Sequence, residues 1–406
     1  MSVLSARDLG YISTLSTVEK IEHTVRTMKK LDKWNGHFYN WYNTETLEPM
    51  KPLYVSTVDN GNLVGYLITL LQSLDELLKR PLIEKENILG LRDILLENFG
   101  NENLEHQSML NMLLGSEEVN ITEWQMLLDD LEGQDEKLDH IISEYEREIS
   151  LFIPWVEQLQ KIPTTLLNEK GVYKSASRKL AELLNKLNDS LSIQHLYDYY
   201  LEILRSLSET MSSLTRDANR SPGFFEARSW LKQLEISLGK SYSAVKDFII
   251  RCHRLQDDIN LLINAMDFKL LYDDKKELFA IGMNVEEDKL SKAYYDLLAS
   301  EARQASFIAI AKGDIPQKHW FKLGRALSLI GDRRVLTSWS GTMFEYLMPL
   351  LIMKNYDNTL LDETYAAVVL AQKQHGEQHR LPWGNSESGF YAFDLHLNYQ
   401  YKAFGV

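Results

Sequence analysis

Carboxylates that lie among aromatic residues and glycines are concentrated in the last quarter of this 406-residue chain. Three segments carry them: YYDLLASEAR (294–303), SWSGTMFEYLMP (338–349) and LPWGNSESGF (381–390). Cleavage of a glycosidic bond uses two carboxyl groups, one that protonates the leaving oxygen and one that attacks or activates water. A tryptophan ring beside such carboxyls offers a face on which a sugar can stack. These segments therefore predict a carbohydrate-active enzyme.

Glu301 and Glu387 are the two carboxylates with the most unusual neighbours. Leu297, Leu298 and Ala299 precede Glu301, so we expect this glutamate inside an apolar helix. Desolvation there would raise its pKa, as a general acid requires. The alternative for Glu301 is a buried glutamate paired with a distant arginine.

Glu387 lies between two glycines and follows Trp383, which predicts an exposed loop where functional residues are common. The alternative for Glu387 is an ordinary surface turn.

Two further acids have a good structural explanation. Glu345 follows Thr342 by three residues, which is the spacing of a capping box in a helix that begins near Ser340 or Thr342. We favour that role over catalysis for Glu345. Asp59, in STVDNGN, could cap the next helix or bind a sugar hydroxyl, and capping is the simpler expectation.

Composition excludes several other classes of function. The formal net charge is −14, which argues against binding to a phosphate backbone. Cys252 is the only cysteine, so neither an intramolecular disulfide nor a cysteine-based zinc site can form, and a cytosolic compartment fits. The histidines form no HExxH pattern, and no glycine-rich phosphate loop occurs. We expect no metal, no cofactor, no nucleic-acid partner, no signal peptide and no membrane-spanning segment.

The elements that would position these residues are mainly helices. Only nine prolines and twenty glycines occur, which favours long helices over many short strands. Helical periodicity predicts a helix over 63–71 capped by DNGN (59–62), and long helices over 122–160 and 175–215 that pair as an antiparallel hairpin. Two β-like runs within 268–285 flank Asp273–Lys276 and predict a small β-hairpin.

Six motifs in order resemble the glucoamylase-like central domain of cyclic β-1,2-glucan synthases. They are GHFYNWYNTETLEPMKPLYVSTVDNGNL, YDLLASEARQASFIAIAKGDIPQKHWFKLGR, SWSGTMFEYLMPLL, NTLLDET, PWGNSESGF and NYQYKAFGV. The resemblance covers roughly residues 10–70 and 265–406. It implies an (α/α)6 toroid. We therefore expect an all-α fold that forms a single domain over 1–406, and the pattern of the chain itself predicts within it a helical insertion at 100–220 and the small β-hairpin. The family's domain continues past the YKAFG motif, so we expect the toroid to be incomplete at its C-terminus.

The resemblance also implies an activity and a site. It implies a retaining transglycosylase that converts linear β-1,2-glucan into cyclic glucan through a glucosyl-enzyme intermediate, with Glu301 as acid/base and Glu387 as nucleophile. An endo-β-1,2-glucanase and a non-catalytic glucan-binding fragment are the alternatives. The implied partners are β-1,2-glucan and the remaining domains of a membrane-bound synthase in the cytoplasm. The substrate-binding residues that we predict are Asp59, Asn60, Arg303, Trp339, Glu345, Tyr346 and Trp383.

Overall fold

The computed structural model describes the chain apart from 100–103, 116–118, 134, 169, 188–191, 219–222, 396–398 and 404. The described chain divides into two compact units. Unit 1 comprises Met1–Val25 and Gln72–Asp257, and unit 2 comprises Arg26–Leu71 and Asp258–Val406. The structure is mostly helical with small antiparallel sheets, so the helical part of the predicted fold class is confirmed.

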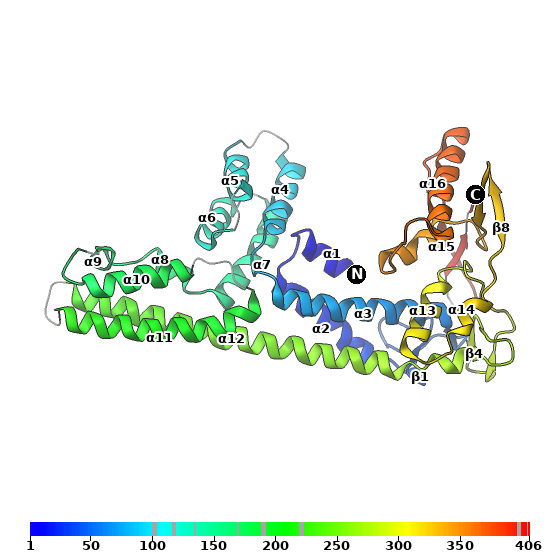
Figure 1. Cartoon of the computed structure of the whole chain (residues 1–406), viewed down its shortest axis with the longest axis horizontal. Helices are drawn as coiled ribbons and strands as arrows, with labels where there is room; N and C mark the ends of the chain where they lie inside the picture. The colour runs from blue at the N-terminus through cyan, green and yellow to red at the C-terminus, as the bar shows by residue number, and fades with distance from the viewer. Residues whose placement is uncertain are drawn as a thin grey trace. The chain divides into compact units, whose positions relative to one another are not determined.

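Unit 1 is built from helices (Figure 1). Helix α10 packs along α11, and both bury leucines at helical spacing, such as Leu180 and Leu183 on α10. The predicted insertion at 100–220 falls within unit 1, and its status as an insertion stays a prediction. The helices that contribute to unit 1, wholly or in part, are α1 (Ser2–Asp8), α2 (Thr14–Lys30), α3 (Thr57–Lys79), α4 (Lys85–Phe99), α5 (Leu104–Gly115), α6 (Ile121–Leu131), α7 (Glu136–Phe152), α8 (Val156–Leu159), α9 (Thr164–Leu167), α10 (Lys174–Leu187), α11 (Ile193–Ala218) and α12 (Phe224–Ala265).

The long helices predicted over 122–160 and 175–215 are each interrupted. Gly133 adopts a positive φ of 83°, and Asp135 then caps α7 by accepting from the N–H groups of Lys137 and Leu138. Pro154, which has no N–H to donate, follows the end of α7 at Phe152. The second segment divides into α10 and α11, which pack on each other. The predicted pairing of two unbroken helices is therefore wrong, because local breaks shorten both.

Unit 2 combines short helices with five small sheets among the described residues. The predicted hairpin within 268–285 is confirmed, with Tyr272 opposite Phe279 and the Asp273 carboxylate accepting from two backbone N–H groups in the turn. Beyond the beginning of α3, its elements include α13 (Ala302–Lys312), α14 (Lys318–Lys322), α15 (Met343–Leu347), α16 (Leu360–His379), η2 (Phe268–Leu271) and η3 (Met348–Leu351).

The strands of unit 2 pair antiparallel as β1–β2, β4–β5, β8–β9, β10–β11 and the three-stranded β3–β6–β7. Residue pairs directly opposite each other include Glu387 and Ala403 in β10–β11 and Val55 and Met283 in β3–β6. The strands are β1 (Lys33–Trp34), β2 (His37–Phe38), β3 (Tyr54–Ser56), β4 (Tyr272–Asp273), β5 (Leu278–Phe279), β6 (Gly282–Asn284), β7 (Lys289–Leu290), β8 (Leu327–Ile330), β9 (Arg333–Leu336), β10 (Glu387–Phe393) and β11 (Tyr399–Ala403).

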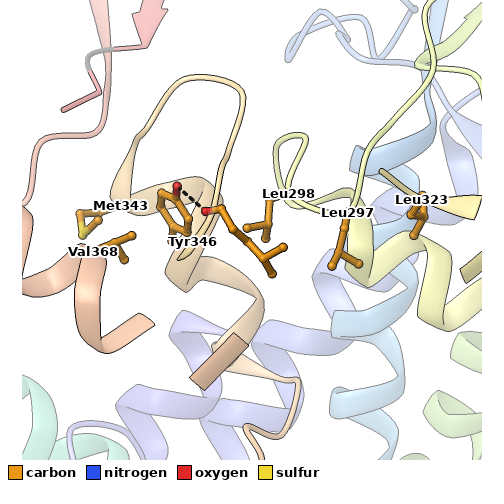
Figure 2. Close-up of a cluster of buried hydrophobic side chains, with 7 residues drawn as sticks. Leu297, Leu298, Leu323, Met343, Tyr346 and Val368 are labelled. Atoms are coloured by element: carbon orange, nitrogen blue, oxygen red, sulfur yellow. Dashed lines mark hydrogen bonds between the residues drawn. The ribbon is translucent and has the colours of Figure 1, made fainter. Parts of the chain in front are cut away.

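A buried cluster of apolar side chains supports the motif-bearing segments of unit 2 (Figure 2). Tyr346 of α15 lies within it, and its hydroxyl donates to the Leu336 carbonyl at 3.1 Å. The same hydroxyl accepts from the Ser338 N–H at 3.1 Å. The cluster therefore fixes the segment before Glu301 and the segment before α15 on one core. Its members are Leu297, Leu298, Leu323, Leu336, Met343, Tyr346 and Val368.

Candidate active site

The beginning of α3 contributes the first acid of the site. The helix begins at Thr57, and the Ser56 hydroxyl accepts from the Asp59 N–H at 3.2 Å. The expectations that DNGN precedes the helix and that Asp59 caps it are therefore wrong, because Ser56 takes the capping position earlier in the chain. Asp59 lies in the first helical turn with an exposed carboxylate, which the helix N-terminus stabilises.

Glu301 occupies the N-cap position of α13, not the helix interior that its apolar neighbours predicted. Ser300, with a positive φ of 50°, turns the chain just before it. Glu301 is only 3% exposed, and its Oε1 accepts from Asn62 Nδ2 at 2.6 Å while the Ser300 hydroxyl donates to Oε2. Burial raises the pKa of Glu301 and nearby Asp59 adds to this, although the hydrogen bonds from Ser300 and Asn62 oppose it. The expected desolvation of this carboxyl is confirmed.

Glu345 connects the segment that contains Ser300 with the segment that contains Ser340. The Thr342 hydroxyl accepts from the Glu345 N–H at 3.3 Å, so the predicted cap at the beginning of α15 is confirmed. The Glu345 carboxylate is buried, and it accepts from the Ser340 N–H at 2.9 Å and the Ser300 N–H at 3.3 Å. Because Ser300 immediately precedes Glu301, this carboxylate fixes the position of the candidate acid.

Glu387 is the first residue of β10, opposite Ala403 on β11, and not a loop residue as predicted. The Asn385 carbonyl accepts from the Met343 N–H at 3.1 Å, which fixes the preceding loop against the beginning of α15. The Glu387 side chain is exposed, yet partial burial raises its pKa, with the charges of Glu301 and Glu345 adding to the effect. Through the bonds of Ser300 to Glu345 and of Met343 to Asn385, α15 connects the segments that carry Glu301 and Glu387.

Trp339 provides a half-exposed ring beside these acids. Its ring stacks on Tyr295 with centroids 5.7 Å apart, and its indole N–H points to the Asp296 carboxylate at 3.4 Å. Burial raises the pKa of Tyr295, and the charges of Asp59 and Glu301 raise it further.

Trp383 lies elsewhere in unit 2, against α16. It is also half-exposed, and the Lys373 ammonium lies 5.1 Å from the centroid of its ring. Of the two predicted stacking surfaces, Trp339 immediately precedes Ser340, whose N–H donates to the Glu345 carboxylate.

Asn60, Arg303 and Tyr346 are buried and bonded to the protein. Asn60 exchanges hydrogen bonds with both backbone groups of Phe38, at 2.7 and 3.0 Å. Arg303 donates to the carbonyls of Glu345 at 3.0 Å and Tyr346 at 2.6 Å, and burial lowers its pKa. Their contact with substrate stays a prediction. The hydrogen bonds that the structure shows hold Asn60 against Phe38 and Arg303 against the backbone of α15.

Asn62, Ser300 and Tyr295 contact or face the candidate acids and were not predicted as site residues. A signal for Asn62 existed, because it follows Asp59 by three residues and so shares a helix face with it. Ser300 and Tyr295 lie within the YYDLLASEAR motif, but only the fold shows which of its side chains face Glu301.

Within the described part of the chain, no group of three or more histidine, cysteine, aspartate or glutamate side chains is arranged to hold a metal ion. The helices in that same part include none that is long and apolar enough to cross a membrane.

The chain is similar to one curated protein in particular. Over 142 residues, 35% of the chain, it is 51% identical to the cyclic beta-(1,2)-glucan synthase NdvB of Rhizobium meliloti (strain 1021). The chain spans 5% of the length of that protein. No protein-family model matches the chain. The similarity confirms the resemblance to cyclic glucan synthases that the motifs predicted.

Proposed function

We propose that the chain acts on linear β-1,2-glucan in the formation of cyclic β-1,2-glucan, as a retaining transglycosylase on an (α/α)6 scaffold. Similarity to a cyclic β-1,2-glucan synthase supports the substrate and the product. The single observation that carries the chemistry is the hydrogen-bonded connection between the segments of Glu301 and Glu387: Glu345 of α15 accepts from the Ser300 N–H beside Glu301, and the Met343 N–H of α15 donates to the Asn385 carbonyl just before Glu387. Two carboxyls in one site, in different environments, are what glycosyl transfer requires.

Glu301 is assigned as the acid/base. Its burial favours the protonated form, so it can hold a proton near neutral pH. Asn62 donates to Oε1, which leaves Oε2 as the oxygen that carries the proton, with the Ser300 hydroxyl beside it. Oε2 would give this proton to the glycosidic oxygen as the bond breaks. The resulting carboxylate would later take a proton from the attacking hydroxyl.

Glu387 is assigned as the nucleophile. Its exposed carboxylate at the beginning of β10 is accessible to a sugar ring. An oxygen of Glu387 would form an ester bond to the anomeric carbon while the bond to the leaving oxygen breaks and that oxygen takes the proton of Glu301. A hydroxyl at the other end of the same glucan then displaces Glu387 and closes the ring. If water attacks instead, the product is a shortened linear glucan.

The remaining residues would bind or position. The exposed carboxylate of Asp59 can accept from a sugar hydroxyl, and the half-exposed ring of Trp339 can stack against a glucose unit. Trp383, also half-exposed, would contact a more distant part of the glucan. Four buried residues would contribute indirectly, because each forms a hydrogen bond that holds a backbone segment in place. They are Asn60, Arg303, Glu345 and Tyr346.

The test compares Glu301→Gln and Glu387→Gln with the unaltered chain on linear β-1,2-glucan. Glu377→Gln, an exposed substitution on α16, is the matched control. The unaltered chain and the control should form cyclic glucan, and each active-site variant should lose roughly 100-fold or more of the turnover. Near-normal turnover by Glu387→Gln would refute its role. New reducing ends would indicate hydrolysis, and glucan binding without any product would indicate a binding module.

A further inference from the structure

Three buried side chains of unit 2 form a hydrogen-bonded series that begins at the candidate acid. Asn62 donates through Nδ2 to Glu301 Oε1 at 2.6 Å, and it accepts through Oδ1 from Gln304 Nε2 at 2.9 Å. Asn62 is 8% exposed and Gln304 is fully buried, so bulk water has little access to these bonds. The series therefore decides which group of the Asn62 amide meets the carboxyl.

Two glycines let α3 approach α13 closely enough for these bonds to form. A Cβ at Gly61 would lie 2.2 Å from Ala305 Cβ, and a Cβ at Gly65 would lie 3.2 Å from Gln304 Nε2. Only a residue without a side chain leaves room at such distances. The turn of α3 that carries Asn62 therefore lies directly on the beginning of α13, and the Gln304 amide is confined beside Gly65.

The two oxygens of the Glu301 carboxyl have chemically different neighbours. Oε1 meets the Asn62 NH2 group, which only donates, whereas Oε2 meets the Ser300 hydroxyl. A hydroxyl either donates or accepts, so Ser300 can bond to Oε2 whether or not that oxygen carries a proton. A proton on Oε1 would instead point at the N–H of Asn62. Both hydrogen bonds are therefore kept only when the proton is on Oε2.

Gln304 opposes the reverse orientation of the Asn62 amide. If Asn62 alone turned over, its NH2 group would face the NH2 group of Gln304, and the bond at 2.9 Å would be lost. Reversal of both amides would require two buried side chains to turn together beside Gly65. The bond to Asn62 holds the Gln304 amide in its orientation although Gln304 Oε1, in the described part of the chain, is left buried without a hydrogen bond. An unpaired buried acceptor is costly, so this orientation has a role to explain.

We propose that Asn62 and Gln304 are positioning residues of the acid/base, which together direct the proton of Glu301 to Oε2. The part of Glu301 in catalysis rests on the proposed function, whereas the place of its proton does not. In glycosyl transfer the Oε2–H bond breaks as the proton passes to the leaving oxygen. Oε2 then takes the proton of the attacking hydroxyl, so each turnover returns the proton to the same oxygen. The Asn62 bond also stabilises the carboxylate and so opposes the effect of burial on the pKa of Glu301.

The experiment is a pH titration of Glu301 in the full chain, labelled with carbon-13 at the glutamate side-chain carboxyls. The Glu301 signal is the one that Glu301→Gln removes. Asn62→Ala removes the donor at Oε1, so Glu301 should bind its proton roughly tenfold more tightly. Gln304→Met, of similar volume, frees the Asn62 amide to turn and should give a smaller change in the same direction, roughly two- to fivefold. Gln374→Met, at an exposed amide on α16, is the matched control and should change nothing.

These substitutions leave the charges around Glu301 in place, so a change in its titration reports the hydrogen bonds. Glu345 bonds to the Ser300 N–H next to Glu301. The other ionisable groups whose charges act on Glu301, or on which Glu301 acts, are Asp59, Tyr66, Tyr295, Arg303 and Glu387.

A second measurement needs no substitution at either amide. The side-chain NH2 signal of Asn62 in nitrogen-15 NMR spectra should shift with the same midpoint as Glu301 and become independent of pH in Glu301→Gln. An Asn62 signal that ignores the Glu301 titration, or a titration that both amide variants leave unchanged, would overturn the proposal.

The glucan assay then connects the amides to turnover. Because the acid must be protonated, Asn62→Ala should lower kcat and move the alkaline limb of the pH–rate profile to higher pH. The two NMR measurements use no glucan, so an unaltered chain without any turnover would refute the proposed function and leave the positioning role to be decided by the titrations.

Discussion

Glu148 on α7 is a buried carboxyl of unit 1, and we expect it to make the stability of that unit depend on pH. It is 2% exposed, and its Oε2 accepts from the Leu15 N–H at 2.6 Å. Burial raises its pKa from 4.5 to about 7, against the opposing effects of the Leu15 N–H, Arg7 and Ser13. Each pKa unit corresponds to about 1.4 kcal/mol, so ionising Glu148 costs the folded state about 3 kcal/mol.

The direction of the effect follows from proton binding. Between pH 4.5 and about 7 the folded state holds the Glu148 proton more tightly than the unfolded chain does. The free energy of unfolding therefore falls as pH rises through that interval and levels off above it. Glu148→Gln keeps an acceptor for Leu15 and removes the charge. We expect it to stabilise unit 1 by up to about 3 kcal/mol at pH 8 and to have little effect at pH 4.5.

Hydrogen–deuterium exchange of peptides from α7 measures this in unit 1 alone. Comparing Glu148→Gln with the unaltered chain at one pH at a time cancels the intrinsic pH dependence of exchange. Glu182→Gln, an exposed substitution on α10, is the control and should leave exchange unchanged at both pH values. If Glu148→Gln destabilises unit 1 equally at pH 4.5 and pH 8, burial is not what controls this carboxyl.

Three further predictions concern unit 2. Glu345→Ala removes the acceptor of two backbone N–H groups and should cost about 2 kcal/mol or more, seen as faster exchange around Ser300; unchanged exchange would contradict this. Tyr346→Phe loses both hydrogen bonds of a buried hydroxyl and should cost about 1–3 kcal/mol in urea unfolding, whereas Tyr356→Phe, at an exposed ring, should cost nothing measurable. Trp339→Ala should raise the KM for β-1,2-glucan with a smaller change in kcat, and a fall in kcat at unchanged KM would argue against a stacking role.

Local sequence signals predicted the elements that short-range chemistry controls. The β4–β5 hairpin followed from its turn residues, and the cap of α15 followed from the spacing of Thr342 and Glu345. The burial of Glu301 followed from its apolar neighbours.

Long-range contacts explain the errors. The apolar run before Glu301 resembled a helix, but Ser300 adopts a positive φ and is held by Glu345, which is 45 residues away in the sequence. Periodicity alone carried a predicted helix through Gly133, although that glycine turns the chain. The strand that begins at Glu387 depends on pairing with β11, which no local pattern near Glu387 indicates.

The central claim is that Glu301 and Glu387 transfer a glucan chain onto its own end. Mass spectrometry of linear β-1,2-glucan after incubation with the full chain tests it most directly. We expect products lighter than a linear glucan of the same length by one water, formed without new reducing ends and absent with Glu387→Gln. Unchanged glucan, or the same cyclic products from Glu387→Gln, would contradict it.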